Sequence, residues 1–573
     1  MFFSHLRSQS LSRRTVNLFL GCDRQARPAP GSFTEMENLS SSGYPALEVR
    51  LRRGTVITLE KPQGLIHKDA LLWVDGGTVY LGGSAVVGPV LTEGPKQLVS
   101  MGTYVVIFPD KLYINTRDLT DWGTLENTTV TTGTVAMNLC RSDGTEYADY
   151  LVSQLAPQEP EPGELWLDTS GDAPVLRQYG QEGWGEAADV CVKLSAAGIG
   201  AGFAAGDGVE ISGCEAESLN GQQVLRLCEQ DAVVLSGTVA GELTQETSVT
   251  LRRTVPDMDF VVECGNRLWG CKYGVVDGRA VNEIYASKLG DFKNWQCYAG
   301  LSTDSYAASR GSDGIFTGAA VYLGSPLFFK EHCMERVYPS AVGAHQIVTL
   351  ECPGIRRGSA ASAVVVDGTL LYHGIGGVYA FDGSLPVPVS AALGDGELTD
   401  AVAGAWQGRY YLSARDEAGA GHLLVYDTRR GLWHRQDDLQ ALAFAGGTGE
   451  LYCLAKDGRL LSMLGSHGTL EGPVSWRART PLSGLDEPEQ GYLVRLSLCL
   501  APEQGGWAEA WLSYDQGQTW VKQGRITGNG RTEGVLLHLR PRRCRQLQLE
   551  LRGSGHCLLY SLSAVYTKGG DGP

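Results

Sequence analysis

Short runs of alternating apolar and polar residues recur along the chain, and each run ends in a turn rich in Gly, Asn or Asp. An alternation of period two is typical of a half-buried β-strand, because successive side chains point to opposite faces of a sheet. Strand–turn–strand units of this kind lie at 71–83, 103–116, 259–274, 321–338, 363–383, 402–414 and 442–463. Helical periodicity is almost absent, so the sequence predicts an all-β protein.

These units also repeat at a regular spacing. The aromatic residues Phe328, Tyr372, Tyr411 and Tyr452 follow one another at steps of 44, 39 and 41 residues. A four-stranded blade of a β-propeller takes roughly 40–50 residues, so each step fits one blade. The seven units therefore predict a β-propeller with about six to eight blades, a fold that leaves few exposed strand edges.

The repeat is interrupted between residues 138 and 255. The Pro- and Glu-rich stretch APQEPEPGE at 156–164 is typical of an extended connector, and short alternating runs follow it. We therefore expect 138–255 to be a small β domain inserted between two blades. This leaves 63–137 and 256–467 to a discontinuous propeller.

The two ends of the chain follow other patterns. Five alternating runs after residue 468 predict a C-terminal β-sandwich over 468–573. Residues 1–62 are expected to form an N-terminal arm or linker, in which only 47–60 is strand-like. The opening MFFSHLRSQSLSRR lacks the long apolar core of a signal peptide.

Composition narrows the function classes. The 573 residues are 43% hydrophobic and 20% charged, with 75 glycines, and the formal net charge is −16. An acidic surface disfavours binding to a phosphate backbone, so we expect no sequence-specific nucleic-acid binding. No run approaches the ~18 apolar residues of a membrane span. The fourteen cysteines include no CxxC pair, which favours buried thiols and assembly in a reducing cytoplasm.

One motif has a defined turn chemistry. The segment SYDQGQTW at 513–520 matches the Asp-box pattern, with Ser513, Asp515, Gly517 and Trp520 at its fixed positions. The Asp caps a tight turn, the Gly adopts a left-handed conformation, and the Trp is expected to anchor the turn in the core. Asp-boxes also occur in sialidases, so a glycosidase is the alternative. A single copy outside the predicted propeller favours a structural turn.

Other motifs are weaker. GIGAGFAAGDG at 198–208 has glycines like those of a phosphate loop, but β-rich sequence flanks it on both sides. The basic RPRRCR at 540–545 favours a solvated turn or a subunit contact over a cationic groove. The adjacent carboxylates Asp437 and Asp438 are typical of a surface turn, although two carboxylates can also flank the sugar in a glycosidase. We therefore predict no catalytic residue, no cofactor and no metal site.

A longer stretch resembles a known group of proteins. It runs from Pro256 to Pro339 and includes PDMDFVVECGNRLWGCKYG, NEIYASKLGDFKNW and STDSYAASRGSDGIFTGAAVYLGSPLFFKEHCMERVYPS. YAFDGSLP at 379–386, LLVYDTRRGLWH at 423–434 and the closing RPRRCRQLQLELRGSGHCLLYSL extend it. These segments resemble tail proteins of tailed phages and Clostridia-type prophages, and are similar to the propeller-bearing tail nozzle proteins of short-tailed phages. MFFSHLRSQSLSRR fits this family poorly, which places an alternative start near Met36.

The resemblance implies a virion structural protein of a bacteriophage tail, a nozzle- or connector-like subunit with no enzymatic activity. It implies a homo-oligomeric ring, six-fold in nozzle proteins, with other tail or portal proteins as partners. The subunit would be assembled into tails in the bacterial cytoplasm and would be located in the virion tail. The alternatives are a tail adhesin that binds glycans or the host cell envelope, and a propeller-type glycoside hydrolase.

Overall fold

The computed structural model describes residues 11–341, 344–447, 449–483, 491–539, 542–544 and 546–568. Within these ranges the regular structure consists of β-strands and three single-turn 3-10 helices, η1 (Glu217–Leu219), η2 (Ala360–Ser362) and η3 (Ala391–Leu393). The prediction of an all-β fold is confirmed, and the strands form many small antiparallel sheets. No helix in the described ranges is long and apolar enough to cross a membrane.

Seven of the sheets, which we number ring sheets 1 to 7, follow one another in chain order. Ring sheet 1 contains β6 (Pro62–His67), β7 (Leu71–Asp75), β8 (Thr78–Leu81) and β9 (Ser84–Ala85). Ring sheet 2 contains β10 (Gln97–Met101), β11 (Tyr104–Phe108), β12 (Leu112–Asn115) and β13 (Trp122–Thr124). Ring sheet 3 contains β27 (Phe260–Glu263), β28 (Leu268–Val276), β29 (Arg279–Ala286) and β30 (Tyr306–Ser309).

The remaining four sheets are built in the same order. Ring sheet 4 contains β31 (Gly318–Tyr322), β32 (Ser325–Phe329), β33 (Cys333–Tyr338) and β34 (Gln346–Glu351). Ring sheet 5 contains β35 (Val364–Val366), β36 (Thr369–Gly374), β37 (Gly377–Phe381) and β38 (Val387–Pro388). Ring sheet 6 contains β39 (Leu398–Trp406), β40 (Arg409–Asp416), β41 (Gly421–Asp427) and β42 (Leu432–Arg435). Ring sheet 7 contains β43 (Ala441–Gly447), β44 (Glu450–Ala455), β45 (Arg459–Ser462), β5 (Gly54–Thr58) and β46 (Thr469–Leu470).

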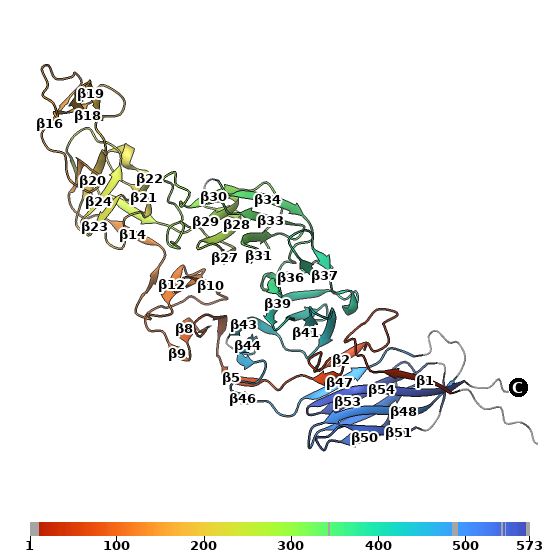
Figure 1. Cartoon of the computed structure of the whole chain (residues 1–573). Coiled ribbons are helices and arrows are strands. Elements are labelled where there is room, and N and C mark those ends of the chain that lie inside the picture. Colours follow the sequence, from red (N-terminus) through yellow and green to blue (C-terminus); the bar gives the residue numbers. More distant parts are fainter. Residues whose placement is uncertain are drawn as a thin grey trace, which may run out of the picture.

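Hydrophobic packing joins each ring sheet to the next. Between sheets 1 and 2, for example, Leu72 packs with Ile107, and both are fully buried. Further clusters join the successive pairs up to sheets 6 and 7. A last cluster contains Leu454 from sheet 7 together with Leu65 and Trp73 from sheet 1, so the ring is closed. Figure 1 shows the seven sheets around a common centre, an arrangement that resembles a β-propeller.

The N-terminal part of the chain completes the last sheet of this ring. Strand β5 pairs antiparallel with β45, with Thr55 opposite Leu461 and Ile57 opposite Leu460. The chain then enters β6 of ring sheet 1, so segments from both ends of the sequence meet where the ring closes. This part of the chain was expected to be strand-like within the N-terminal arm.

Three more sheets lie between ring sheets 2 and 3 in chain order, and we call the residues that form them, 127–253, the insert. Its first sheet contains β14 (Asn127–Val130), β26 (Thr250–Arg253), β21 (Gly208–Ser212) and β22 (Gly221–Val224). Its second contains β23 (Leu227–Glu229), β24 (Ala232–Ser236), β20 (Cys191–Ser195), β15 (Val135–Cys140) and β25 (Leu243–Gln245). The third, which we call the tip sheet, contains β16 (Tyr150–Ser153), β17 (Leu165–Asp168), β18 (Val175–Gly180) and β19 (Gly183–Glu186). One hydrophobic cluster draws on all three sheets.

The terminal module consists of residues 11–49 and 475–568, and its two sheets enclose one core. One sheet contains β3 (Leu39–Ser40), β4 (Leu47–Val49), β54 (Cys557–Lys568), β48 (Gly491–Pro502), β51 (Glu533–His538), β1 (Leu11–Val16) and β52 (Arg543–Cys544). The other contains β2 (Glu35–Glu37), β47 (Ser475–Arg479), β53 (Gln548–Ser554), β49 (Trp507–Ser513) and β50 (Val521–Thr527). Four strands thus come from the segment expected as an arm, because its apolar residues Phe19, Phe33 and Met36 are buried in this core.

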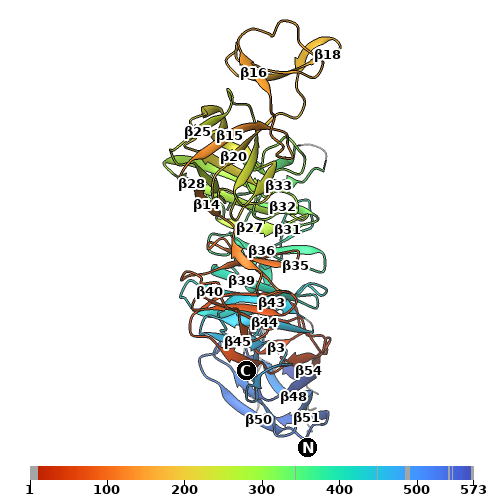
Figure 2. The ribbon, with the colours of Figure 1, turned by 90° about the vertical axis from the view of Figure 1, so that its left-hand side faces the viewer.

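The molecule is elongated. Figures 1 and 2 show the tip sheet at one end, the ring in the middle and the terminal module at the opposite end. The two views agree on this order, so the insert and the terminal module lie far apart.

Candidate interaction surfaces and the joints between them

The four Asp-box residues named from the sequence lie together in one turn between β49 and β50. Asp515 Oδ1 accepts hydrogen bonds from the Ser513 hydroxyl and from the Thr519 backbone N–H, each at 2.8 Å. The Gly517 backbone, at a φ of 87°, donates to the Ser513 hydroxyl oxygen at 2.8 Å. Hydrogen bonds from Thr519 and Ser513 lower the pKa of the Asp515 carboxyl to about 2.

The Trp520 side chain differs from the expectation of a core anchor. It is half-buried, and its indole N–H donates to the Gly517 carbonyl oxygen at 3.1 Å. The Arg479 guanidinium lies 5.0 Å from its ring centroid. Trp520 therefore packs beneath an arginine at the surface of the terminal module.

A buried polar joint connects the insert to ring sheet 3. Asn294, in the loop after β29, accepts a hydrogen bond from the Gly208 backbone N–H at 2.9 Å and donates one to Asp207 at 2.9 Å. Asp207 also pairs with Arg253, whose guanidinium donates to the Leu125 carbonyl oxygen at 2.9 Å. Asn294, Asp207 and Arg253 are all buried, so this network is shielded from water.

The two segments of this joint approach each other too closely for a larger residue. A Cβ atom at Gly208 would lie 2.5 Å from the Gln296 carbonyl oxygen. The Lys288 ammonium adds a hydrogen bond to the Gly206 carbonyl oxygen at 2.9 Å. The glycine-rich segment 198–208, considered above as a phosphate loop, thus ends in a contact with the LGDFKNW turn.

A second polar joint lies where residues 50–53 lead from the terminal module into the ring, and there the Arg50 guanidinium donates to the Asn38 side-chain oxygen of the terminal module at 2.7 Å. The Arg53 guanidinium pairs with Asp437 at 2.6 Å and donates to the Gln436 side-chain oxygen at 2.8 Å. Arg50 pairs with Glu471 and with Asp437. Burial alone raises the pKa of the Asp437 carboxyl, but the Arg53 and Arg50 guanidiniums outweigh it and hold that pKa below its ordinary value. Asp437 is therefore an ionised partner within the joint, whereas Asp438 is exposed.

Two histidines are buried in ring sheets 5 and 6. His373 and His434 are 1% and 2% exposed, and burial lowers the pKa of each to about 4. His434 lies on β42, against the N-terminal segment, where the Cys22 backbone N–H donates to the Trp433 carbonyl oxygen at 2.6 Å. Both imidazoles are thus neutral at neutral pH.

The tip sheet has one buried and one aromatic face. Leu167 and Leu176 pack into the core of the insert and are 0% and 1% exposed. The opposite face carries Trp166, Tyr179 and Trp184. The Trp184 ring centroid lies 5.3 Å from that of Tyr179 and 5.4 Å from that of Trp166. We call this surface the aromatic face.

The outer face of the second sheet of the terminal module carries arginines stacked on tryptophans. Arg525 lies 4.4 Å from the Trp507 ring centroid, and Arg552 lies 4.6 Å from that of Trp511. Glu509, on β49 between β50 and β53, pairs with Lys522 at 2.5 Å and with Arg525 at 3.4 Å. We call it the arginine–tryptophan face.

A cavity of about 760 Å³ lies in the terminal module. Apolar residues dominate its lining, including Phe19, Phe33, Leu496, Leu512 and Leu549. A cavity of this size and lining suits an apolar group. Within the described residues, no group of three or more His, Cys, Asp or Glu side chains is placed to hold a metal ion.

Sequence reasoning did not find the aromatic face, the arginine–tryptophan face or either joint. The alternation of Leu165, Trp166 and Leu167 in β17 does show that Trp166 faces away from two apolar neighbours, and this signal was available. Residues 540, 541 and 545 of the basic segment RPRRCR lie outside the described residues.

Comparison with known proteins gives no family. No family model and no curated protein matches the chain. Among solved structures, an exo-β-1,3-galactanase from Phanerochaete chrysosporium is similar at 10% identity and a TM-score of 0.20, over 53% of this chain and 94% of that one. A sialidase from Trypanosoma rangeli is similar at 8% identity and a TM-score of 0.21, over 96% and 97% of the two chains.

These neighbours contradict the expectation that the chain has no enzymatic activity, and that expectation is corrected. It relied on the absence of a catalytic pattern along the sequence. The two carboxylates of a glycosidase, however, are defined by their separation in space and need no sequence motif. At TM-scores near 0.2, the likenesses assign neither an activity nor a substrate to this chain.

Proposed function

We propose that the chain is a structural subunit of a bacteriophage tail, which joins other copies of itself in a ring and contacts portal or connector proteins. The sequence from Pro256 to Pro339 supports this proposal through its resemblance to prophage tail proteins. The ring of seven sheets is, in this proposal, a seven-bladed β-propeller that serves as the rigid centre of the subunit. Virion assembly would take place in the bacterial cytoplasm.

The observation that carries the proposal is the pair of buried joints on either side of the ring. Asn294 and Asp207 fix the insert to ring sheet 3, and Arg50, which bonds to Asn38 of the terminal module and to Asp437, fixes that module to the ring. Modules linked by flexible connectors usually meet through small polar interfaces and move relative to one another. Buried hydrogen-bonded charges favour one arrangement, because breaking such a pair leaves a charge unpaired in a low dielectric. A ring subunit needs this property, since its contact surfaces must keep a fixed separation.

A gene deletion tests the proposed function. Removing this gene from an inducible prophage is expected to give particles with incomplete tails in electron micrographs, and a plasmid copy is expected to restore them. Complete tails on the deletion particles would contradict the structural role.

Glycan hydrolysis is measured in parallel on the purified chain, with sialosides, galactans and capsular glycans as substrates. Complete tails together with release of sugar would favour the glycoside hydrolase. Complete tails with glycan binding but no release would favour the adhesin.

A further inference from the structure

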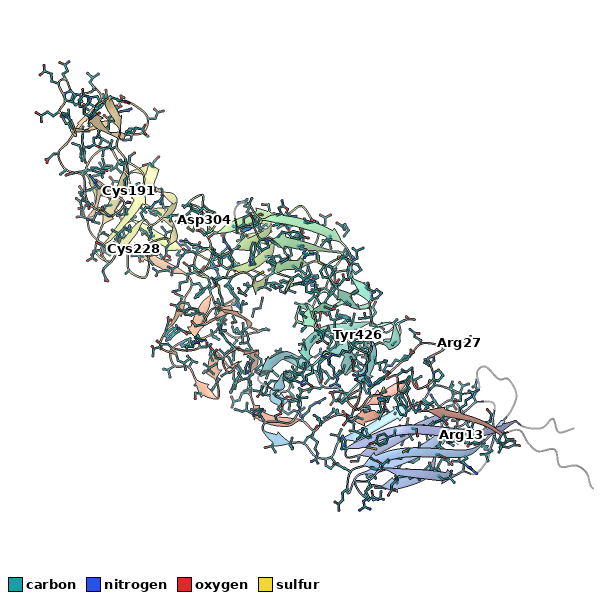
Figure 3. The ribbon with its side chains drawn as sticks, viewed as in Figure 1. Arg13, Arg27, Cys191, Cys228, Asp304 and Tyr426 are labelled. Atoms are coloured by element: carbon teal, nitrogen blue, oxygen red, sulfur yellow. The ribbon has the colours of Figure 1, made fainter. Side chains whose placement is uncertain are left out.

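Charge is distributed unevenly along the length of the molecule. The insert, residues 127–253, contains 19 Asp or Glu against 6 Lys or Arg, a formal net charge of −13. The described residues of the terminal module contain 14 Lys or Arg against 9 Asp or Glu, a formal net charge of +5. Figure 3 shows the insert, marked by Cys191 and Cys228, and the terminal module, marked by Arg13 and Arg27, at opposite ends. The protein therefore has an acidic end and a basic end.

On the aromatic face of the acidic end, Tyr179 and Trp184 are half-buried, whereas Trp166 is buried and its ring centroid lies 5.9 Å from the Arg177 guanidinium of the same sheet. The opposite face of the tip sheet packs on the insert core, and Leu151, which pairs with Trp166 across β16 and β17, is 50% exposed. Residues 150–188 contain 7 Asp or Glu against a single basic residue, Arg177. Glu182 and Glu186, which flank Trp184 in β19 and its turn, are both exposed. This surface combines aromatic rings with carboxylates, which together attract guanidinium and ammonium groups.

The basic end presents the complementary chemistry. On the arginine–tryptophan face, the side chains of Arg525, Lys522 and Arg552 are 48%, 41% and 37% exposed. Lys522 and Arg525 pair with Glu509, whose side chain is 8% exposed, and Arg552 pairs with Glu550, whose side chain is 0% exposed. The two carboxylates therefore lie beneath the three cations, which keep one formal positive charge in excess. Arginines that lie over tryptophan rings have fewer conformations to lose when they pair with carboxylates from a partner.

We propose that the aromatic face of one copy docks on the arginine–tryptophan face of a second copy. The two faces lie at opposite ends of one rigid body, so they do not meet within a chain. Contact between different surfaces of identical subunits is heterologous, and it generates a closed ring when the rotation between copies closes. The inference rests on the proposed function for the existence of a ring, and it names the surfaces that build it.

Sedimentation velocity of the full chain tests this contact. Self-association is expected to rise with protein concentration at about 50 mM NaCl and to weaken at about 500 mM, because salt screens exposed charges. The double variant Glu182→Lys/Glu186→Lys is expected to weaken association by about tenfold or more, since it turns attraction into repulsion. Glu60→Lys/Glu417→Lys makes the same charge change at exposed positions of the ring and is expected to associate like the unmodified chain.

The variant Trp184→Ala measures how much the aromatic ring contributes to self-association, because it leaves the charge of the chain unchanged. It is expected to weaken association by about tenfold or more, as aromatic residues at the centre of an interface commonly do. Thermal melting of every variant confirms that the chain is folded. Glu182 and Glu186 are exposed, so their replacement leaves the core of the insert intact.

Carbodiimide cross-linking identifies the docking face. This reagent joins a carboxylate directly to an amine, so a mixture of isotope-labelled and unlabelled chains is expected to give mixed-label links between Glu182 or Glu186 and Lys522. The link between Lys522 and Glu509 within one chain, whose atoms lie 2.5 Å apart, is the internal control.

Three outcomes would overturn the inference: no self-association at low salt, association that survives both tip variants, or mixed-label links confined to other surfaces. If these tests fail but the gene is required for complete tails, the proposed function stands and this contact is rejected. If the tests succeed but deletion of the gene leaves the tails complete, the contact stands and the proposed function is rejected.

Discussion

At the scale of single residues, the joints between modules depend on buried charges that each have a partner. Asp437 illustrates this, because it joins Arg53 at 2.6 Å and Arg50 at 3.5 Å. Asp437→Asn would leave Arg53 without an anionic partner and Arg50 with Glu471 alone, and it is expected to destabilise the joint by about 3–5 kcal/mol. Denaturant unfolding followed by Trp fluorescence measures the loss. Asp438→Asn is the matched control, since Asp438 is exposed, and equal effects of the two variants would contradict the assigned role.

The buried histidines predict how stability depends on pH. The pKa values of His373 and His434 are lowered to about 4, whereas an unfolded histidine titrates near 6.5. Between these values the unfolded state binds more protons, so stability is full above about pH 6.5 and falls by about 3 kcal/mol per histidine as the pH drops towards 4. The melting temperature is expected to decrease over this window, and His434→Gln is expected to flatten the decrease. An unchanged slope in the variant would contradict a neutral, buried His434.

At the scale of elements, the sequence predicts the strand pairs that are local and misses those that are distant. Phe328, Tyr372, Tyr411 and Tyr452, whose spacing predicted the blade-length repeat, all lie on the second strand of their ring sheets, β32, β36, β40 and β44. Each such strand pairs with its neighbours through a short turn, so the pattern is visible along the chain. Strand β1, in contrast, pairs Leu11 with Thr567, and no local pattern encodes such a pairing. The joint between the insert and the ring escaped prediction for the same reason, since Asp207 and Asn294 lie 87 residues apart in sequence.

The LGDFKNW turn is the element that holds the insert. Asn294→Ala would remove the partner of the buried Gly208 N–H and one partner of Asp207, at an expected cost of about 1–3 kcal/mol. Hydrogen exchange is expected to accelerate at residues 206–208 and 287–297, while the remaining ring sheets keep their protection. Asn529→Ala, at an exposed asparagine of the terminal module, is the control. Unchanged exchange at residues 206–208 would show that the joint does not depend on this side chain.

At the scale of the whole molecule, the closed ring, the two joints and the opposite charges of the two ends all bear on the proposed role as a ring subunit. The ring gives a rigid centre, the joints fix both ends to it, and the charges favour contact between the ends of different copies. The central claim is that this body is a subunit of a phage tail. Electron cryo-microscopy of particles from the induced prophage tests it most directly. A ring of density is expected at the tail, into which the insert, ring and terminal module fit together in the arrangement of Figure 1, with the tip sheet against a neighbouring copy. Complete tails in which no density accommodates this chain would contradict it.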